Sequence, residues 1–235
     1  ENMNMLLVFV LMVCALGFVL LMQRQSLSHT YVALVVLYLV TTLTAGKIIM
    51  LDFGLFSVPA SCAAPLYGAI FLVTDIISER HGKKQALRAV WLGLFSVIAL
   101  CLFGLIIRAI SAAEGDVLAE ALSVIFGFTP RLVVGSLIAY VIAQHVDVWI
   151  FEKLKNMHGD RLLWLRNNCS TLVSQFIDSL VVFSIAFIGV IDNWVVVMFS
   201  TYVIKVVVAL CDTPWLYFAR RYGPREESVE RGENA

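Results

Sequence analysis

Apolar residues in this chain gather in long runs, and most polar residues lie between those runs. Each run is about 20 residues long, which is the length that a helix needs to cross about 30 Å of hydrocarbon. Buried helices of a soluble protein would keep a polar face, and most of these runs have none. Seven runs are predicted to span a membrane: residues 5–22, 31–51, 58–78, 86–110, 132–151, 168–191 and 194–218.

The runs predict an all-α, polytopic membrane protein with about seven transmembrane helices. Residues 1–219 are expected to form a single transmembrane domain, followed by a polar cytoplasmic tail over residues 220–235. The first run lacks the basic leader and the cleavage site of a signal peptide, so we predict that it is a helix. The composition agrees, with 60% hydrophobic and 14% charged residues, against about 45–50% and 25% in soluble proteins.

Charges in the connections between runs alternate in sign along the chain. The basic connections carry Arg24; Arg80, Lys83, Lys84 and Arg88; Lys153, Lys155, Arg161 and Arg166; and Arg220, Arg221, Arg225 and Arg231. The acidic connections carry Asp52; Glu114, Asp116 and Glu120; and Asp192. The positive-inside rule then predicts an N-terminus outside and a C-terminus in the cytoplasm. Residues 111–129, which mix acidic and apolar side chains, are expected to form a short interfacial helix outside.

A polar stripe runs along the sixth predicted span. It consists of Asn168, Thr171, Gln175 and Asp178, which step by three or four residues and therefore share one helix face. An ionisable side chain in mid-membrane costs at least about 2.5–3.5 kcal/mol, so it faces a cavity or a partner. The stripe predicts a water-accessible cavity or ligand site, with hydrogen bonding between helices as the alternative.

Other spans carry polar residues that would form further walls of the same cavity. Their members are Gln144 and Asp147 in the fifth span, Asp75 and Glu79 at the inner end of the third, Lys47 in the second, and Lys205 and Asp212 in the seventh. Glu79 has an equally good interpretation as a solvated loop charge. Asp178 and Lys205 lie at similar depths, so an ion pair between them is expected, and such a pair can also open to receive a ligand.

Several classes of function are disfavoured by what the sequence lacks. No CxxC or His–Cys pattern suggests a metal or redox site, so we expect no metal and no cofactor. No H-E-x-x-H or G-x-S-x-G motif is present, so we do not expect an enzyme. The formal net charge is zero, which gives no reason to expect a nucleic-acid partner.

Four stretches together resemble one transporter family. They are residues 45–47 (AGK), 75–84 (DIISERHGKK), 144–151 (QHVDVWIF) and 164–171 (WLRNNCST), the last continuing to residues 175–179 (QFIDS). Their order and spacing resemble the YhhQ-type queuosine-precursor transporters, also called the VUT family. The resemblance covers residues 31–215 approximately and does not include the first span.

The resemblance implies import of 7-cyano-7-deazaguanine or its aminomethyl derivative, precursors of a modified tRNA base, across a bacterial inner membrane. It implies a multi-pass core similar to the substrate-binding subunits of energy-coupling-factor transporters, with no ATPase module required. The alternative is a vitamin-binding subunit of an ATP-driven importer of that class. The partners expected are the small deazapurine and the lipid bilayer, and a homodimer is one arrangement that the sequence allows.

The chemistry of a deazaguanine suits the polar residues named above. Its ring N–H and exocyclic amine donate to a carboxylate, and its carbonyl accepts from an amide or a lysine. We expect Asp178 and Gln175 to bind the donor edge, and Lys47 or Lys205 to meet the carbonyl. The predicted substrate-binding residues are Lys47, Asp75, Glu79, Gln144, Asp147, Asn168, Gln175, Asp178 and Lys205. A gate or proton path is predicted from Asp75, Glu79, Asp147, Arg166, Asn167 and Asp212.

Overall fold

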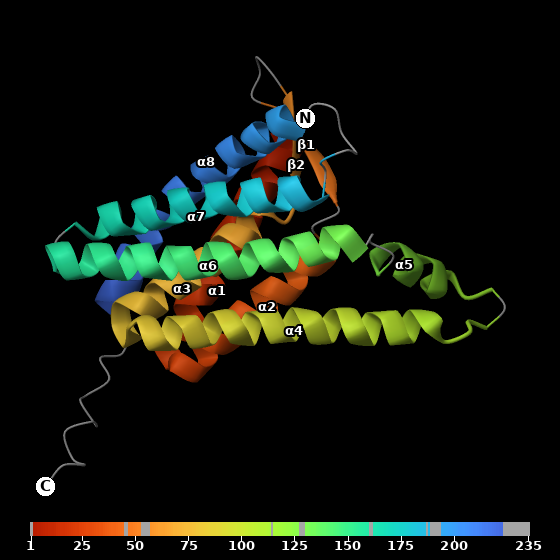
Figure 1. The fold of residues 1–235 in the computed structure, drawn as a ribbon, viewed down its shortest axis with the longest axis horizontal. Helices are drawn as coiled ribbons and strands as arrows, with labels where there is room; N and C mark the ends of the chain where they lie inside the picture. The colour runs from red at the N-terminus through yellow and green to blue at the C-terminus, as the bar shows by residue number, and fades with distance from the viewer. Residues whose placement is uncertain are drawn as a thin grey trace, which may run out of the picture.

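The computed structural model describes residues 2–44, 47–52, 57–113, 115–126, 130–159, 162–186, 188 and 194–222. Within these residues it contains seven long helices, one short helix and one pair of strands (Figure 1). The long helices are α1 (Asn2–Gln25), α2 (Leu27–Thr44), α3 (Ala64–His81), α4 (Lys83–Ala109), α6 (Pro130–His158), α7 (Leu163–Ala186) and α8 (Trp194–Tyr222). The short helix is α5 (Val117–Ile125), and strands β1 (Ile48–Asp52) and β2 (Ser57–Ser61) form an antiparallel hairpin.

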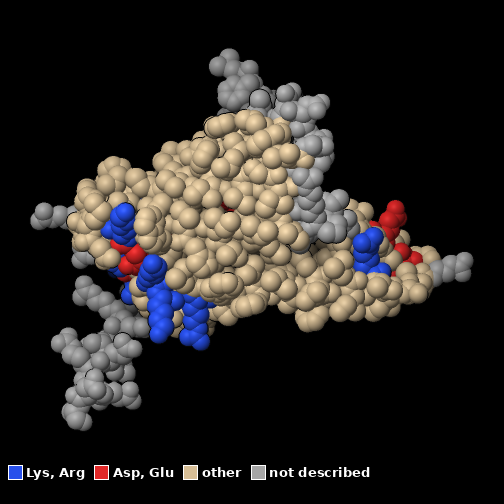
Figure 2. Space-filling view, in the orientation of Figure 1, with Lys and Arg blue, Asp and Glu red and all other residues tan. Residues whose placement is uncertain are grey.

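Six of these helices are long and apolar enough to cross a membrane: α1, α2, α4, α6, α7 and α8. Their outward surfaces carry large apolar side chains, such as Leu6, Phe95 and Phe103, which are more than half exposed. In a soluble protein such a surface would be an aggregation hazard, whereas in a bilayer lipid covers it. Figure 2 shows a broad band almost free of charged atoms between charged groups at the two ends of the molecule. The protein is therefore an all-α, multi-pass membrane protein.

Helix α3 lies in the centre of the bundle and differs from the other long helices. It packs against α1, α2, α4, α6 and α8, and all of its residues from Gly68 to Ser78 are buried. Its sequence contains Asp75, Glu79 and Arg80. Because protein surrounds it, these charges avoid the cost of contact with hydrocarbon.

The ends of two predicted spans lie in the hairpin instead of in helices. The run over residues 31–51 was expected to be one helix, but α2 ends at Thr44 and the residues from Ile48 form β1. The run over residues 58–78 begins in β2, and α3 starts only at Ala64. Pro59 pairs with Met50 in the hairpin, and a proline within a helix would lack the backbone donor that the helix needs. Pro65 is tolerated in the first turn of α3, where no such donor is required.

The first run is built into the bundle as helix α1, which packs against α2, α3 and α8. Leu16 and Val19 on this helix are fully buried. Close packing elsewhere depends on a small residue: a Cβ on Gly93 of α4 would lie 2.7 Å from the Tyr140 hydroxyl of α6 and 2.8 Å from Leu34 of α2. The short helix α5 lies within residues 111–129, as expected, and Asp116 caps it by accepting from Leu118 N–H at 2.9 Å.

Candidate functional site

The candidate site is built by two helices that face each other, α3 and α7. Along α3 the side chains of Tyr67, Asp75 and Glu79 recur at multiples of four residues, and so share one broad face. They contact Asp178, Thr171 and Arg166 of α7, respectively. The contacts run in opposite directions along the two helices, as antiparallel neighbours require. They divide the buried polar interior into three layers, which we call outer, middle and inner.

The outer layer consists of Tyr67, Asp178 and Lys205, from α3, α7 and α8. The Tyr67 hydroxyl donates to Asp178 Oδ1 at 2.7 Å, and Lys205 Nζ donates to Asp178 Oδ2 at 2.6 Å. The Lys205 ammonium also lies 5.1 Å from the centroid of the Tyr67 ring, a cation–π distance. The Asp178 side chain is 4% exposed. The ion pair expected between Asp178 and Lys205 is thus present, and both carboxylate oxygens have protein donors.

The middle layer consists of Asp75 from α3, Asp147 from α6, and the hydroxyls of α7 around them. Thr171 Oγ1 donates to Asp75 Oδ2 at 3.4 Å, and Ser174 Oγ donates to Asp147 Oδ1 at 2.9 Å. Both carboxyl groups are almost completely buried, at 1% exposure for Asp75 and 0% for Asp147.

Gln144 extends the middle layer on α6. Its Oε1 accepts from Thr74 Oγ1 at 3.1 Å, next to Asp75 on α3. Its Nε2 is buried and has no hydrogen-bond partner among the described residues. A buried polar atom without a partner costs about 1–3 kcal/mol, so this amide is placed to bind water or a ligand.

The inner layer is centred on Glu79, near the end of α3. Its carboxylate is paired with Arg166 of α7, with Lys155 Nζ of α6 at 3.7 Å and with Arg220 Nε of α8 at 3.5 Å. Lys155 Nζ also donates to the backbone oxygens of Ser78 and Glu79, at 3.0 and 2.7 Å. The Glu79 side chain is only 6% exposed, so its interpretation as a solvated loop charge is wrong. Instead, one carboxylate joins four helices at this end of the bundle.

Three amide side chains of α7 place buried oxygens in or beside these layers. Gln175 Oε1, Asn167 Oδ1 and Asn168 Oδ1 have no hydrogen-bond partner among the described residues. Gln175 lies one turn from Asp178, on the face predicted from the sequence. Asn168 instead points towards α8, where its Nδ2 donates to Thr213 Oγ1 at 2.8 Å.

One predicted residue lies outside the three layers, and two contact residues were missed. Lys47 is exposed at the start of the hairpin, where its backbone N–H donates to Thr44 O at 3.0 Å. The side chain of Asp212 lies outside the described residues. Tyr67 and Ser174 are contact residues that sequence reasoning did not include. Helical spacing could have found both, because Tyr67 lies eight residues before Asp75 and Ser174 lies three after Thr171.

Aromatic side chains on the helices that build the layers differ in position. Phe71 is fully buried and meets Tyr67 edge-on, with ring centroids 5.5 Å apart. Tyr140 is also buried, but it packs on Tyr38 and donates to Val90 O at 3.3 Å. Trp149 is 51% exposed and lies under Lys153, away from the layers. Phe71 is therefore the ring nearest to the outer layer along α3.

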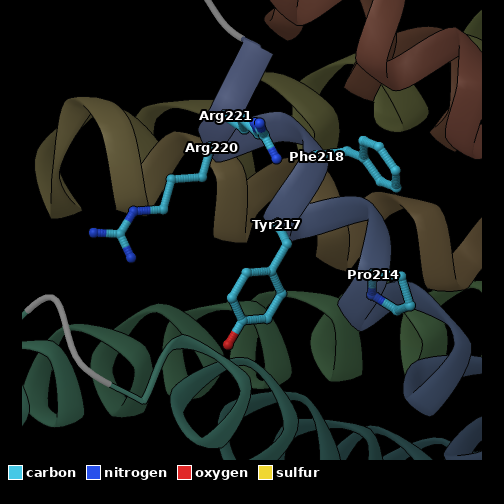
Figure 3. Close-up of a pocket in the computed structure, with 5 residues that line it drawn as sticks. All are labelled: Pro214, Tyr217, Phe218, Arg220 and Arg221. Atoms are coloured by element: carbon cyan, nitrogen blue, oxygen red, sulfur yellow. The ribbon is translucent and has the colours of Figure 1, made fainter.

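A shallow pocket lies on the surface of α8 at the same end as the inner layer. Figure 3 shows its lining residues: Pro214, Tyr217, Phe218, Arg220 and Arg221. The Tyr217 hydroxyl accepts from Trp164 N–H at 3.3 Å, which connects α8 to the start of α7. Exposed aromatic rings beside arginines are typical of a membrane–water boundary. We assign this pocket to the boundary and not to the interior site.

Comparisons with known proteins agree on one family. Residues 61–219 match the family model described as "Putative vitamin uptake transporter". A Bacillus subtilis protein named "Probable queuosine precursor transporter" is 36% identical over 189 residues, which cover 79% of this chain and 82% of that protein. The Escherichia coli "Queuosine precursor transporter" is 23% identical over 191 residues, covering 79% and 81%. No solved structure matches the chain, so similarity to energy-coupling-factor subunits remains a prediction.

Proposed function

The chain belongs to the VUT family of membrane transporters, and from this premise we propose that it imports queuosine precursors across the bacterial inner membrane. The substrates are 7-cyano-7-deazaguanine, its aminomethyl derivative, or both. Relatives named for this transport support the substrate class. The structural observation that carries the proposal is the outer layer, where a buried carboxylate, an ammonium and a phenol converge.

The outer layer offers groups that match the edge of a deazaguanine. The ring N–H and exocyclic amine are donors, and Asp178 provides two acceptor oxygens. The substrate carbonyl is an acceptor, and Lys205 provides a donor that is already at the site. Gln175 Oε1, which is buried without a partner, supplies a further acceptor one turn away. Tyr67 and Lys205 donate to the two carboxylate oxygens of Asp178, so its charge is paired within the outer layer.

The inner layer is proposed to close the cytoplasmic end of the path. The basic residues of the inner connections support an orientation with this end in the cytoplasm, the N-terminus outside and the C-terminus inside. Glu79 holds α6, α7 and α8 to the end of α3 through Lys155, Arg166 and Arg220. Opening towards the cytoplasm would require these ion pairs to separate. Asn167 and Asn168 lie beside them at the start of α7.

Transport is proposed to need no ATPase module. The experiment is uptake of radiolabelled 7-cyano-7-deazaguanine by bacteria that lack both its synthesis and their own transporter. Expression of this chain is expected to restore intracellular label and the modified base in tRNA, without co-expression of any ATPase subunit. Cells that express the chain in the membrane and accumulate no label would overturn the proposal. Label that appears only with an added coupling ATPase would favour the ATP-driven alternative.

A further inference from the structure

Gln144 on α6 is a buried side chain that the substrate contacts described above leave unused. It is 0% exposed and lies three residues before Asp147, on the same side of the helix. Its Oε1 lies 3.1 Å from Thr74 Oγ1 of α3, whereas its Nε2 has no hydrogen-bond partner among the described residues. Buried polar groups are nearly always hydrogen-bonded, so this amide indicates a place where a further polar group binds.

The contact between Thr74 and Gln144 can be made in two ways. The Thr74 hydroxyl has one proton and two acceptors within reach, Phe71 O at 2.8 Å and Gln144 Oε1 at 3.1 Å. If the proton goes to Gln144 Oε1, the amide presents its Nε2 donor. If the proton goes to Phe71 O, the hydroxyl can accept instead, and the amide turned over donates Nε2–H to it and presents Oε1. Because the two forms have the same shape, one side chain can offer a donor or an acceptor at the same place.

The Gln144 amide lies between the outer and middle layers. Ser174 of α7 contacts Asp147 of α6 at 2.9 Å, and Asp178 lies four residues further outward on α7, which is about 6 Å at 1.5 Å per residue. Gln144 lies on the outward side of Asp147, and its amide reaches Thr74, next to the middle layer on α3. A bicyclic base that presents its amine edge to Asp178 can therefore reach this amide with its opposite end.

The other buried amides of α7 are less suited to that end of the base. Gln175 lies one turn from Asp178 on the same face, so its Oε1 adjoins the donor edge that Asp178 meets. Asn167 and Asn168 lie eleven and ten residues before Asp178, where they donate to Thr213 Oγ1 of α8 at 3.3 and 2.8 Å. Among these amides, Gln144 is the one placed to contact the far end of the base.

We propose that Gln144 recognises the group at position 7 of the deazaguanine, by which the two precursors differ; this rests on the transport function proposed above. A nitrile nitrogen only accepts hydrogen bonds, so the cyano base receives one from Nε2 of Gln144. A protonated aminomethyl group only donates, so it binds Oε1 of the amide in its other orientation. The ammonium also needs a countercharge, and Asp147 provides a carboxylate one turn away on α6. One side chain thus allows both precursors to bind.

The test measures binding by the full chain in lipid nanodiscs, with three radiolabelled bases: the cyano base, the aminomethyl base and unsubstituted 7-deazaguanine. Wild-type protein is expected to bind both precursors more tightly than 7-deazaguanine, which has no group for Gln144 to bind. Gln144→Leu is expected to weaken binding of each precursor about tenfold, because one hydrogen bond is lost. Its affinity for 7-deazaguanine is expected to be unchanged. Gln25→Leu makes the same change at an exposed position of α1 and is the matched control, with wild-type affinities expected.

Gln144→Glu tests the direction of the hydrogen bond. A carboxylate only accepts, so this variant is expected to lose about tenfold in affinity for the cyano base and to keep its affinity for the aminomethyl base. This variant decides the question if Gln144→Leu does not fold. Equal losses for all three bases, as a merely structural role would produce, or unchanged affinities in both variants would overturn the proposal. Failure of the wild-type protein to bind either precursor would instead overturn the proposed function.

Discussion

At the scale of single residues, Asp178 shows how the charge of a proposed binding residue is neutralised by neighbouring side chains. Tyr67 and Lys205 occupy both carboxylate oxygens, at 2.7 and 2.6 Å. A buried ion pair contributes little to stability overall, because the cost of desolvating two charges offsets their attraction. Removing one partner is costly, however, because the other charge is left buried. A substrate that replaces Lys205 at Asp178 avoids that cost by bringing its own donors.

The first prediction concerns this pair. Asp178→Asn is expected to reduce uptake of 7-cyano-7-deazaguanine at least tenfold, because the amide keeps only one acceptor oxygen and turns the other position into a donor, which cannot accept from a substrate amine. It also leaves Lys205 without its countercharge, at a cost on the order of 3 kcal/mol. The double variant Asp178→Asn with Lys205→Met removes both charges and is expected to recover thermal stability in detergent, but not uptake. Recovery of uptake by the double variant would show that the pair is structural only.

At the scale of elements, α3 carries the polar chemistry that the other helices surround. Its contacts with α7 are made by side chains from Tyr67 at one end to Glu79 at the other. Its close packing is with α1, α2, α4, α6 and α8. A relative movement of α3 and α7 would therefore change all three layers at once, while the apolar contacts of α3 on its other sides remain.

The second prediction concerns the inner end of these helices. Glu79→Gln is expected to weaken the ties to Arg166, Lys155 and Arg220, and so to favour opening towards the cytoplasm. Liposomes preloaded with labelled substrate should then lose it several-fold faster than liposomes with wild-type protein. The isosteric change leaves the buried Arg166 guanidinium without its countercharge, so the melting temperature in detergent should also fall. Glu120→Gln, which removes an exposed carboxylate of α5, serves as the control. An unchanged rate of loss for Glu79→Gln would contradict the assignment of Glu79 to a gate.

At the scale of the whole molecule, the distribution of charge separates the two ends of the bundle. The inner connections carry the lysines and arginines, including Lys83, Lys84 and Lys153. The opposite end carries the acidic Asp116 and Glu120 on or beside α5, together with Arg108 at the end of α4. A bilayer with the cytoplasm on the lysine-rich side would agree with the positive-inside rule, because most of the basic residues would then lie in the cytoplasmic connections.

The third prediction follows from this charge bias. A green fluorescent protein fused to the C-terminus is expected to fluoresce, and alkaline phosphatase fused there is expected to be inactive, because the tail lies in the cytoplasm. The same phosphatase inserted between α4 and α5 should be active, because that connection lies outside. Activity of the tail-fused phosphatase would contradict the seven-helix topology.

Much of the membrane architecture could be predicted from the sequence, because hydrocarbon imposes length and composition on each crossing separately. Helices α1, α4, α6, α7 and α8 could each be identified from their own apolar run, without information on the helices that they pack against. The polar stripe of α7 was equally visible, since helical spacing alone places Gln175 and Asp178 on one face. The hairpin was missed because residues 48–51 are as apolar as a spanning helix, and hydropathy does not distinguish a strand from a helix in so short a run.

The sequence by itself determined which residues are too polar for lipid; the tertiary structure alone decided which of them meet. Four carboxylates cannot be told apart by their sequence surroundings, because each lies inside or at the end of an apolar run: Asp75, Glu79, Asp147 and Asp178. Packing of α3 among the other helices gives Asp178 a lysine and Glu79 an arginine, whereas Asp75 and Asp147 accept from the hydroxyls of Thr171 and Ser174. The same packing leaves Lys47 exposed at the hairpin. The physical reason is that a helix fixes the face of each side chain, whereas the countercharge comes from another helix, and its identity depends on contacts between residues far apart in the chain.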